Sequence, residues 1–386
     1  MSKPSILVLC LFFFAAGCRP EEQFRQQLQP ETTTTPVKHN SHPGHITSSI
    51  LNRDGNIVAC GSEGANGMLW VISRNTGHIV FSRSYPSSEF GSFLEIEEKN
   101  SGGYMICGSK ISDSGDTDIH MTSVTAEGDL VWHKSVGGLQ DEINMSMTRA
   151  ASGQFVVVAA QKNSTYDLFD MWMTESGSEW HLVFEEPGEQ VPYCATKSAD
   201  GGILITGTDN DNIVSRSKFY LMKFGPTLDT VFRVSKQVNN THTIARNSIE
   251  LSGGSVVSCG SRATEGKVIG FICKTSNAGI VEWDREYSGD TNMIISKLVA
   301  DDQGFKAIGY IYGNCEDCNS RSLLISLDAQ GNEQWRKICE PEAGSEEMAE
   351  NFFPGTDGML LQNSSNKNGA YYFFIQRVDK EGKVTD

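Results

Sequence analysis

A cassette of about 50 residues recurs along almost the whole chain. In each copy, a turn rich in Gly and Asp precedes a short apolar run that usually ends in Gly, as in DGNIVACG and DQGFKAIG. The residues that end this run lie 47 to 54 positions apart, at Gly61, Gly108, Ala159, Gly207, Gly260, Gly309 and Asn363. A chain with this regularity is expected to fold as seven similar units.

Each copy holds four short runs that are typical of strands. The first apolar run is followed by a second, such as SLLISL, then by a turn such as DAQGN and a run that ends in an aromatic residue, as at Trp283 and Trp335. Another short run, such as ISKLV, precedes the first turn. Short apolar or alternating runs bounded by Gly, Asn and Asp indicate antiparallel strands joined by hairpins. Each unit is therefore predicted to be one four-stranded sheet.

Seven such units predict an all-β fold, a single seven-bladed β-propeller of four-stranded blades over residues 44–386. A unit cannot bury both faces of its own sheet, so the ring must close. The last copy ends at EGKVTD with no aromatic residue, so we expect the strand near Ile46–Leu51 to complete a mixed blade. An array of β-sandwiches and an open β-solenoid are the alternative folds.

The first 18 residues predict a targeting segment. Ile6–Ala16 is apolar but too short for a stable span, and small residues follow it, as in a signal peptide. The sequence AAGC, which ends at Cys18, resembles the lipobox of bacterial lipoproteins, and that resemblance implies that Cys18 becomes the lipidated N-terminus. The alternative is an ordinary signal peptide cleaved nearby. Residues 19–43, rich in Gln, Thr and Pro, are predicted to be a disordered tether.

The charge of the chain limits its partners. The formal net charge is −16 over 386 residues. Such an acidic balance argues against nucleic acid as a partner and against electrostatic docking on anionic lipid. The membrane is therefore expected to be reached through the lipid on Cys18.

The cysteines fall into two groups. Cys60, Cys107 and Cys259 share one position in their copies, where other copies have Val, Thr or Ile, and they are predicted to be free thiols that serve as small apolar residues. Cys315 and Cys318 lie in a polar loop of a protein expected to be exported, where disulfides form, so they are predicted to be disulfide-bonded. Unpaired thiols and half of a zinc or redox site are the alternatives.

No catalytic residue, metal site or cofactor is predicted. The sequence contains no Ser-His-Asp order and no phosphate-binding loop. The acidic loops Asp113–Asp118 and Asp209–Asn212 could supply oxygens to Ca²⁺, but neither has the residue order of a calcium-binding loop. The basic residues on the expected innermost strands are a weak candidate for binding an anionic ligand at one mouth of the channel: Arg149, Lys197, Arg246 and Lys297. The alternative is that they are solvated charges at strand ends.

The unit DQGFKAIG … SLLISLDAQGNEQWRK resembles a repeat common in exported bacterial β-propeller lipoproteins, and more distantly the blades of quinoprotein-like propellers. The resemblance covers about residues 44–386. It implies a lipid-anchored β-propeller of the cell envelope and is weak evidence for function. We expect the protein to lie at the outer membrane and to act as a scaffold for a protein or glycan partner. The alternatives are a propeller enzyme acting on a polysaccharide and an envelope assembly factor. Because the polar loops vary and no catalytic group is legible, binding is predicted rather than catalysis.

Overall fold

The structure is a computed structural model, and it describes residues 32–34, 41–138, 140–162, 169–175, 181–184, 188–210, 216–238, 241–264, 266–313, 319–339, 341, 344–355 and 358–385. The chain divides into two units, Met1–Pro30 and Glu31–Asp386, and the strands all belong to the second. One short helix, α1 (Ser87–Phe90), lies in the described part. Within that part, no helix has the length and apolar character needed to cross a membrane.

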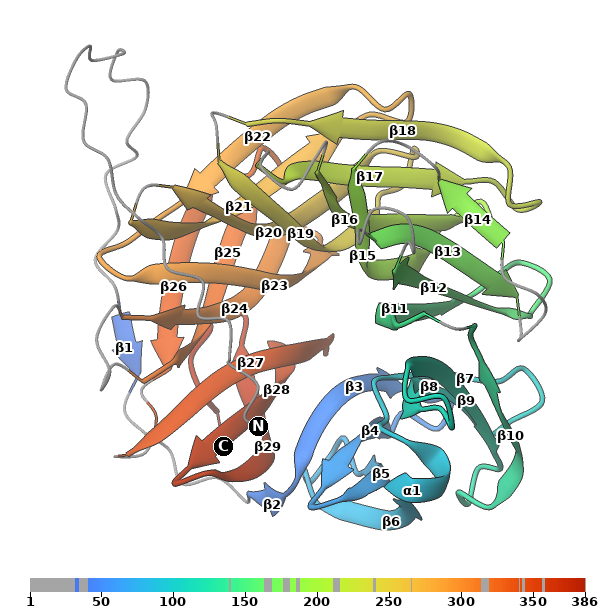
Figure 1. The fold of residues 1–386 in the computed structure, drawn as a ribbon. Helices are drawn as coiled ribbons and strands as arrows, with labels where there is room; N and C mark the ends of the chain where they lie inside the picture. Colours follow the sequence, from blue (N-terminus) through green and yellow to red (C-terminus); the bar gives the residue numbers. More distant parts are fainter. Residues whose placement is uncertain are drawn as a thin grey trace, which may run out of the picture. The chain divides into compact units, whose positions relative to one another are not determined.

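The described strands form seven sheets, which follow one another in chain order (Figure 1). The first sheet contains β3 (His45–Leu51), β4 (Ile57–Glu63), β5 (Asn66–Ile72) and β6 (Ile79–Pro86). The second contains β7 (Glu95–Glu98), β8 (Tyr104–Ile111), β9 (Thr117–Val124) and β10 (Leu130–Val136). The third contains β11 (Glu142–Arg149), β12 (Phe155–Lys162), β13 (Phe169–Glu175) and β14 (His181–Phe184).

The fourth sheet contains β15 (Glu189–Lys197), β16 (Ile203–Asn210), β17 (Lys218–Phe224) and β18 (Thr230–Lys236). The fifth contains β19 (His242–Glu250), β20 (Val256–Thr264), β21 (Lys267–Thr275) and β22 (Val281–Tyr287). The sixth contains β23 (Asn292–Asp301), β24 (Gly304–Tyr312), β25 (Arg321–Asp328) and β26 (Glu333–Cys339), to which β1 (Thr32–Thr34) adds a parallel fifth strand. The seventh contains β27 (Ser345–Pro354), β28 (Gly358–Lys367), β29 (Ala370–Asp379) and β2 (His42–Pro43).

The predicted hairpin order within each unit is confirmed. Six sheets have four strands, and neighbouring strands within each sheet are antiparallel along the chain. The fold is therefore an all-β propeller with four-stranded blades. The sixth sheet departs from this pattern only through the extra strand β1, which lies within the range predicted to be a tether.

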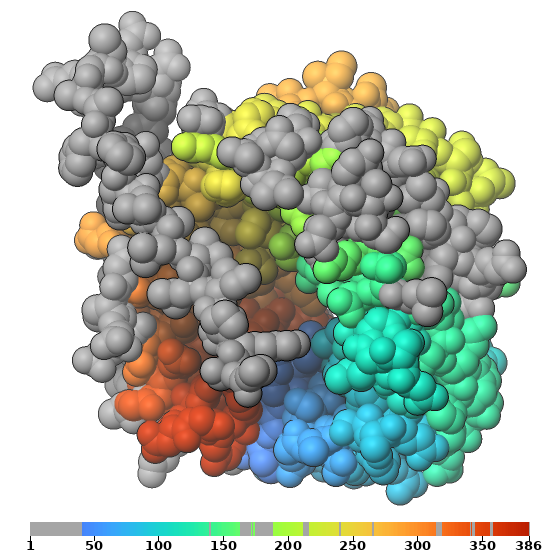
Figure 2. All heavy atoms as spheres, viewed as in Figure 1, coloured from blue at the N-terminus to red at the C-terminus, as the bar shows by residue number. Residues whose placement is uncertain are grey.

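A strand from the N-terminal part of the chain completes the last sheet, as predicted, but the segment near Ile46–Leu51 was the wrong one. Ile46–Leu51 belongs to β3 and pairs with β4 in the first sheet, whereas His42–Pro43 pairs with the last strand, β29. The chain can do this because β2 directly precedes β3, and only Gly44, with a positive φ of 114°, separates them. Figure 2 shows the first sheet, in blue, beside the last sheet, in red.

The apolar core is divided among the contacts between sheets. The described residues form seven clusters of buried side chains. Each joins two sheets that are successive along the chain or, in one case, the seventh and the first. The cluster that closes this circuit packs Trp70 against Phe373, with ring centroids 5.1 Å apart. No sheet is buried by itself, which explains why the units must occur together.

The aromatic residues near the ends of the fifth and sixth copies, Trp283 and Trp335, also pack between sheets. A Cβ placed on Gly331 would lie 2.8 Å from the ring of Trp283, and one on Gly382 would lie 2.6 Å from the ring of Trp335. Both glycines belong to the matching turn of the following sheet and have positive φ. The turn glycine and the aromatic ring therefore fit together as one contact between successive sheets.

Candidate functional site

The first strand of each sheet borders the axis around which the sheets are arranged. These seven inner strands are β3, β7, β11, β15, β19, β23 and β27, and each contacts the next in turn. In six of them, pairing with the following strand shifts in register near the middle. The residues left out of the pairing are Thr47, Asn144 with Met145, Tyr193, Arg246, Ser296 and Glu350. A β-bulge of this kind redirects the extra side chain, often at a binding site.

The glycine that ends the first apolar run lies opposite the bulge. A Cβ on Gly260 would lie 1.9 Å from the carbonyl oxygen of Ile244, and one on Gly309 would lie 1.9 Å from that of Ile294. No side chain fits these two contacts, so glycine is required at both positions. The seventh sheet has Asn363 at the equivalent position and its inner strand bulges as well. The third sheet has Ala159 instead, and its bulge differs because it contains two residues, Asn144 and Met145.

Arg246 is the centre of an aromatic cluster at this level. Its guanidinium carbon lies 5.9 Å from the centroid of the Tyr193 ring, which belongs to the preceding sheet. The following sheet contributes Tyr310 and Tyr312, whose ring centroids are 6.1 Å apart. Burial raises the pKa of both phenol groups, and the charge of Arg246 acts in the opposite direction with a smaller effect. The Nε atom of Arg246 is buried without a hydrogen-bond partner, and no described residue forms an ion pair with this guanidinium.

Glu350 brings a carboxyl group to the same cluster from β27. Burial raises the pKa of Glu350, while the charges of Lys297 and Arg246 act in the opposite direction. Inner strands of four successive sheets thus place a tyrosine, an arginine, a serine and a glutamate at equivalent bulge positions. A guanidinium that keeps a free N–H donor among tyrosine rings suits a planar anion attached to a ring with an apolar face.

One residue further along each inner strand, polar side chains form a belt between the sheets. Glu95 Oε2 accepts a hydrogen bond from Ser48 Oγ at 2.8 Å, and Glu95 Oε1 accepts one from Ser146 Oγ at 3.3 Å, so this carboxyl group joins three sheets. Burial raises the pKa of Glu95, and the charge of Lys297 together with these hydrogen bonds lowers it. Asn247 Oδ1 similarly accepts a hydrogen bond from Leu298 N, at 3.3 Å.

A cavity of about 380 Å³ opens where four inner strands end. Its lining includes Lys197 and Lys297, the amides of Asn247 and Asn351, and the apolar side chains of β19, β23 and β27. No described residue hydrogen-bonds to the ammonium of Lys197 or of Lys297 or forms an ion pair with either. At the same end, the charges of Arg149 and Lys197 lower the pKa of Glu97, but burial and Glu95 outweigh them and raise it to about 7.

The structure thus places the four basic residues predicted from the sequence in three different surroundings. Lys197 and Lys297 line one cavity, and Arg246 lies one residue before that level, among the tyrosines. Arg149 donates hydrogen bonds to the carbonyl oxygen of Glu98 at 3.2 Å and to Asn100 Oδ1 at 2.6 Å, so it joins the second and third sheets. Cys18, Cys315 and Cys318 lie outside the described residues.

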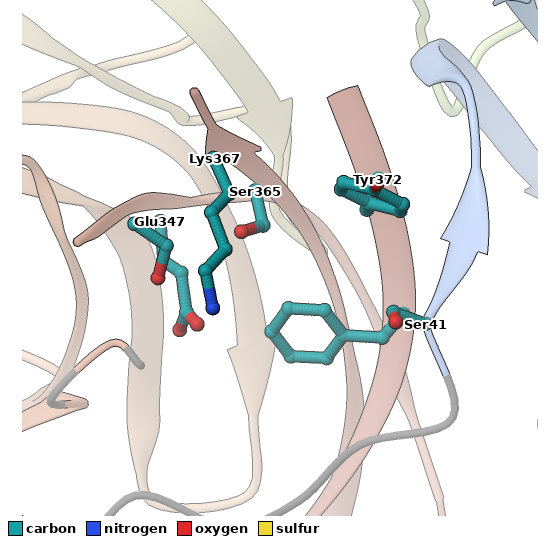
Figure 3. A pocket seen from close by; sticks show the side chains of 7 residues that line it. Ser41, Glu347, Ser365, Lys367 and Tyr372 are labelled. Atoms are coloured by element: carbon teal, nitrogen blue, oxygen red, sulfur yellow. The ribbon is translucent and has the colours of Figure 1, made fainter. Parts of the chain in front are cut away.

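A second cavity, of about 280 Å³, lies against the seventh sheet (Figure 3). It is lined by Ser41 and by side chains of β27, β28 and β29, including Glu347 and Lys367, whose charged groups point toward the same space. No other sheet contributes to this lining. The cluster around Arg246, by contrast, contains residues from four sheets. It is therefore the better candidate for a binding site that depends on the repeated architecture.

The sequence pointed to Arg246 and Lys297 but missed Tyr193, Tyr310 and Glu350. Periodicity places a residue on an inner strand but does not reveal a register shift, so the bulge residues could not be recognised. Tyr310 follows Gly309 directly, in a segment whose variation between copies had suggested recognition. That variation was the feature of the sequence that could have indicated Tyr310 as a site residue.

Cys60, Cys107 and Cys259 are buried free thiols in the structure, as predicted. Burial raises the pKa of each of these thiols far above its ordinary value. Their role is to fill space between sheets, where each belongs to an apolar cluster.

No protein-family model and no curated protein matches this sequence. Among solved structures, the polysaccharide lyase Uly1 is similar over 93% of this chain and 94% of its own, with a TM-score of 0.54 and 11% identity. The Pan2 WD40 domain of Neurospora crassa is similar over 88% of this chain and 91% of its own, with a TM-score of 0.52 and 13% identity. At such identities the likeness concerns the backbone alone. The chain has the fold of a β-propeller.

Proposed function

We propose that this protein is a lipid-anchored, exported, seven-bladed propeller that binds an acidic glycan at the channel, through Arg246 and the tyrosines around it. The seven sheets and the seven apolar clusters between them support one closed ring. The AAGC sequence ending at Cys18 supports lipidation and an outer-membrane location. The observation that carries the choice of ligand is the Arg246 guanidinium, whose Nε is buried without a hydrogen-bond partner and which lies among tyrosine rings.

The chemistry of the cluster favours a carboxylate-bearing sugar. A guanidinium can donate two parallel hydrogen bonds to a carboxylate, and such charge-assisted bonds are among the stronger ones in proteins. Tyrosine rings offer apolar faces against the sugar ring and hydroxyls that meet its polar edge. The formal charge of −16 would repel a polyanion at a distance. Recognition must therefore be local, at residues such as Arg246.

Calorimetric titration with an oligogalacturonate tests this proposal. The wild type is expected to bind the acid and to bind its methyl ester, which lacks the charge, at least about tenfold more weakly, because a hydrogen bond to a charged group contributes about 1.5–3 kcal/mol. Arg246→Ala should lose the preference for the acid. Arg285→Ala is the matched control, since Arg285 is an exposed cation on β22, the last strand of the same sheet.

The opposite outcomes are equally clear. Equal affinity for the acid and the ester, or an Arg246→Ala variant that binds the acid as the wild type does, would reject the acidic ligand.

For the anchor, Cys18→Ala is expected to release the protein from membranes. Wild-type protein in the soluble fraction, with processing that globomycin does not inhibit, would overturn lipidation.

An enzyme acting on a polysaccharide is the second candidate. Glu350 favours it, because a carboxyl group with a raised pKa beside a guanidinium and phenol groups is suited to proton transfer. The fold shared with a polysaccharide lyase is compatible with this reading but does not select it. Turnover of a bound glycan that Glu350→Gln abolishes while binding persists would establish the enzyme over the scaffold.

A further inference from the structure

Three basic residues lie on successive inner strands, at different levels along the axis. Lys197 belongs to β15, Arg246 to β19 and Lys297 to β23, and these strands follow one another around the axis (Figure 1). Strand pairing places Arg246 at its bulge and Lys297 directly after the equivalent residue, Ser296. Lys197 lies at the far end of its strand, beyond the bulge residue Tyr193. Together the three basic residues form a cationic row.

The length of the cationic row follows from strand geometry. A strand rises about 3.3 Å per residue, and the position of Lys197 is about four residues beyond that of Arg246, so the backbone positions of the row span about 13 Å. A carboxylate accepts charge-assisted hydrogen bonds at about 2.7–2.9 Å, and its two oxygens belong to one small group. One carboxylate is therefore too small to engage the whole row.

The cavity of about 380 Å³ connects the two lysines of the row. Both Lys197 and Lys297 line it, and no described residue hydrogen-bonds to either ammonium group or forms an ion pair with it. The amide of Asn351 also lines the cavity, but it already donates to the carbonyl oxygen of Ser49, at 2.7 Å. The two ammonium groups therefore remain available to a ligand.

Glu250 does not neutralise these lysines, although it lines the same cavity. Its Oε1 accepts a hydrogen bond from Lys223 Nζ at 2.6 Å, and its Oε2 accepts one from Ser198 Oγ at 2.5 Å. Lys223 belongs to β17 of the fourth sheet and lies outside the cavity lining. The charge of Glu250 is thus already compensated within the sheets.

Three carboxyl groups on other inner strands also act on the row. The charge of Lys297 lowers the pKa values of Glu95 and Glu350, and the charge of Lys197 lowers that of Glu97. Burial outweighs these attractions and raises all three pKa values, so the neutral carboxyl groups are favoured. None of the three forms an ion pair with either lysine. The lysines therefore keep positive charge that a ligand can compensate.

We infer that the glycan lies along the channel axis and presents consecutive acidic units to the cationic row, one to Arg246 and the next to Lys297 and Lys197. Arg246 is not part of the cavity lining, so a carboxylate bound to it leaves both lysines to a second one. The two sites adjoin, because Asn247 of the lining directly follows Arg246 in β19. The inference rests on the proposed function and narrows its ligand to a run of acidic sugars.

Calorimetry with galacturonic acid and with trigalacturonate, at constant ionic strength, tests the length of the ligand. The wild type is expected to bind the trimer at least about tenfold more tightly than the monomer, because an added hydrogen bond to a charged group contributes at least that factor. The double variant Lys197→Gln, Lys297→Gln should lose most of this ratio between the two affinities.

The double variant Lys380→Gln, Lys383→Gln is the matched control. It removes the same charge at two exposed positions, next to the end of β29, and should keep the ratio of the wild type. A control variant that loses the ratio as well would show that net charge, and not the row, makes the trimer bind more tightly.

The remaining outcomes separate this inference from the proposed function. Equal affinities of the wild type for monomer and trimer would overturn the inference and leave the binding of one acidic sugar at Arg246 intact. A wild type that binds galacturonate of neither length would reject the proposed function, and the inference with it. A Lys197→Gln, Lys297→Gln variant that keeps the ratio would also overturn the inference. Should this variant fail to fold, Lys297→Gln alone should reduce the ratio while Lys297→Arg retains it.

Discussion

Asn351 donates a hydrogen bond from Nδ2 to the carbonyl oxygen of Ser49, at 2.7 Å, across 302 residues of sequence. The same Nδ2 lies 2.9 Å from Ser49 Oγ, and both residues are buried. Ser49 belongs to the inner strand of the first sheet and Asn351 to that of the seventh. This contact therefore joins the ends of the chain at the axis, while β2 joins them at the outer edge.

Replacing Asn351 with leucine should destabilise the protein. Leucine has nearly the same volume but leaves the carbonyl of Ser49 buried without a donor, which costs about 1–3 kcal/mol. Urea unfolding measures the effect, and Asn75→Leu is the control because Asn75 is exposed. Equal midpoints for Asn351→Leu and the control would show that this hydrogen bond adds nothing to ring closure.

Gly44 should tolerate a side chain much less well than Gly64. Both have positive φ, 114° and 60°, so alanine is strained at each. At Gly44, a Cβ would also lie 2.8 Å from the indole of Trp70, whereas at Gly64 it would meet open space. Gly44→Ala should therefore lower the free energy of unfolding by at least about 1 kcal/mol more than Gly64→Ala. Similar losses in the two variants would contradict a tight passage between β2 and β3.

The stability of the protein should fall as pH rises through the titration of Glu97. The pKa of this carboxyl group is raised from 4.5 to about 7, so the folded protein holds the proton more tightly than the unfolded chain. The stabilising effect is complete below pH 4.5 and disappears as pH rises toward 7, by at most about 1.4 kcal/mol per pH unit.

Glu97→Gln should therefore reduce the slope of stability against pH in this window, as urea midpoints at several pH values will show. Glu127→Gln, on an exposed turn, should leave the slope as it is in the wild type. An unchanged slope in Glu97→Gln would mean that this carboxyl group is ionised in the folded protein at pH 5.

The cysteines should respond to alkylation in two ways. Cys60, Cys107 and Cys259 are buried, and burial raises their thiol pKa values, so native protein should leave them unlabelled by iodoacetamide while unfolded protein should label them fully. Cys315 and Cys318 should stay blocked even after unfolding, until a reductant is added. Mass spectrometry distinguishes the groups, and free labelling of Cys315 and Cys318 in exported protein would reject their disulfide.

The sequence predicted the repeated sheet well because each strand and turn is encoded locally. Turn glycines, short apolar runs and the aromatic at Trp283 or Trp335 recur at fixed spacing, and the structure places them as expected. The mixed last sheet was predicted, but the segment that completes it was misassigned, because pairing of His42–Pro43 with β29 depends on a contact across most of the chain.

The bulges on the inner strands have a consequence for how such a protein diversifies. Since the extra residue does not take part in the pairing of its sheet, exchanging it leaves the backbone bonds of both strands intact. Thr47, Tyr193, Arg246, Ser296 and Glu350 are five different residue types at one structural position. Each copy of the repeat can thus exchange this residue independently, because the strand pairing that maintains the architecture does not depend on it.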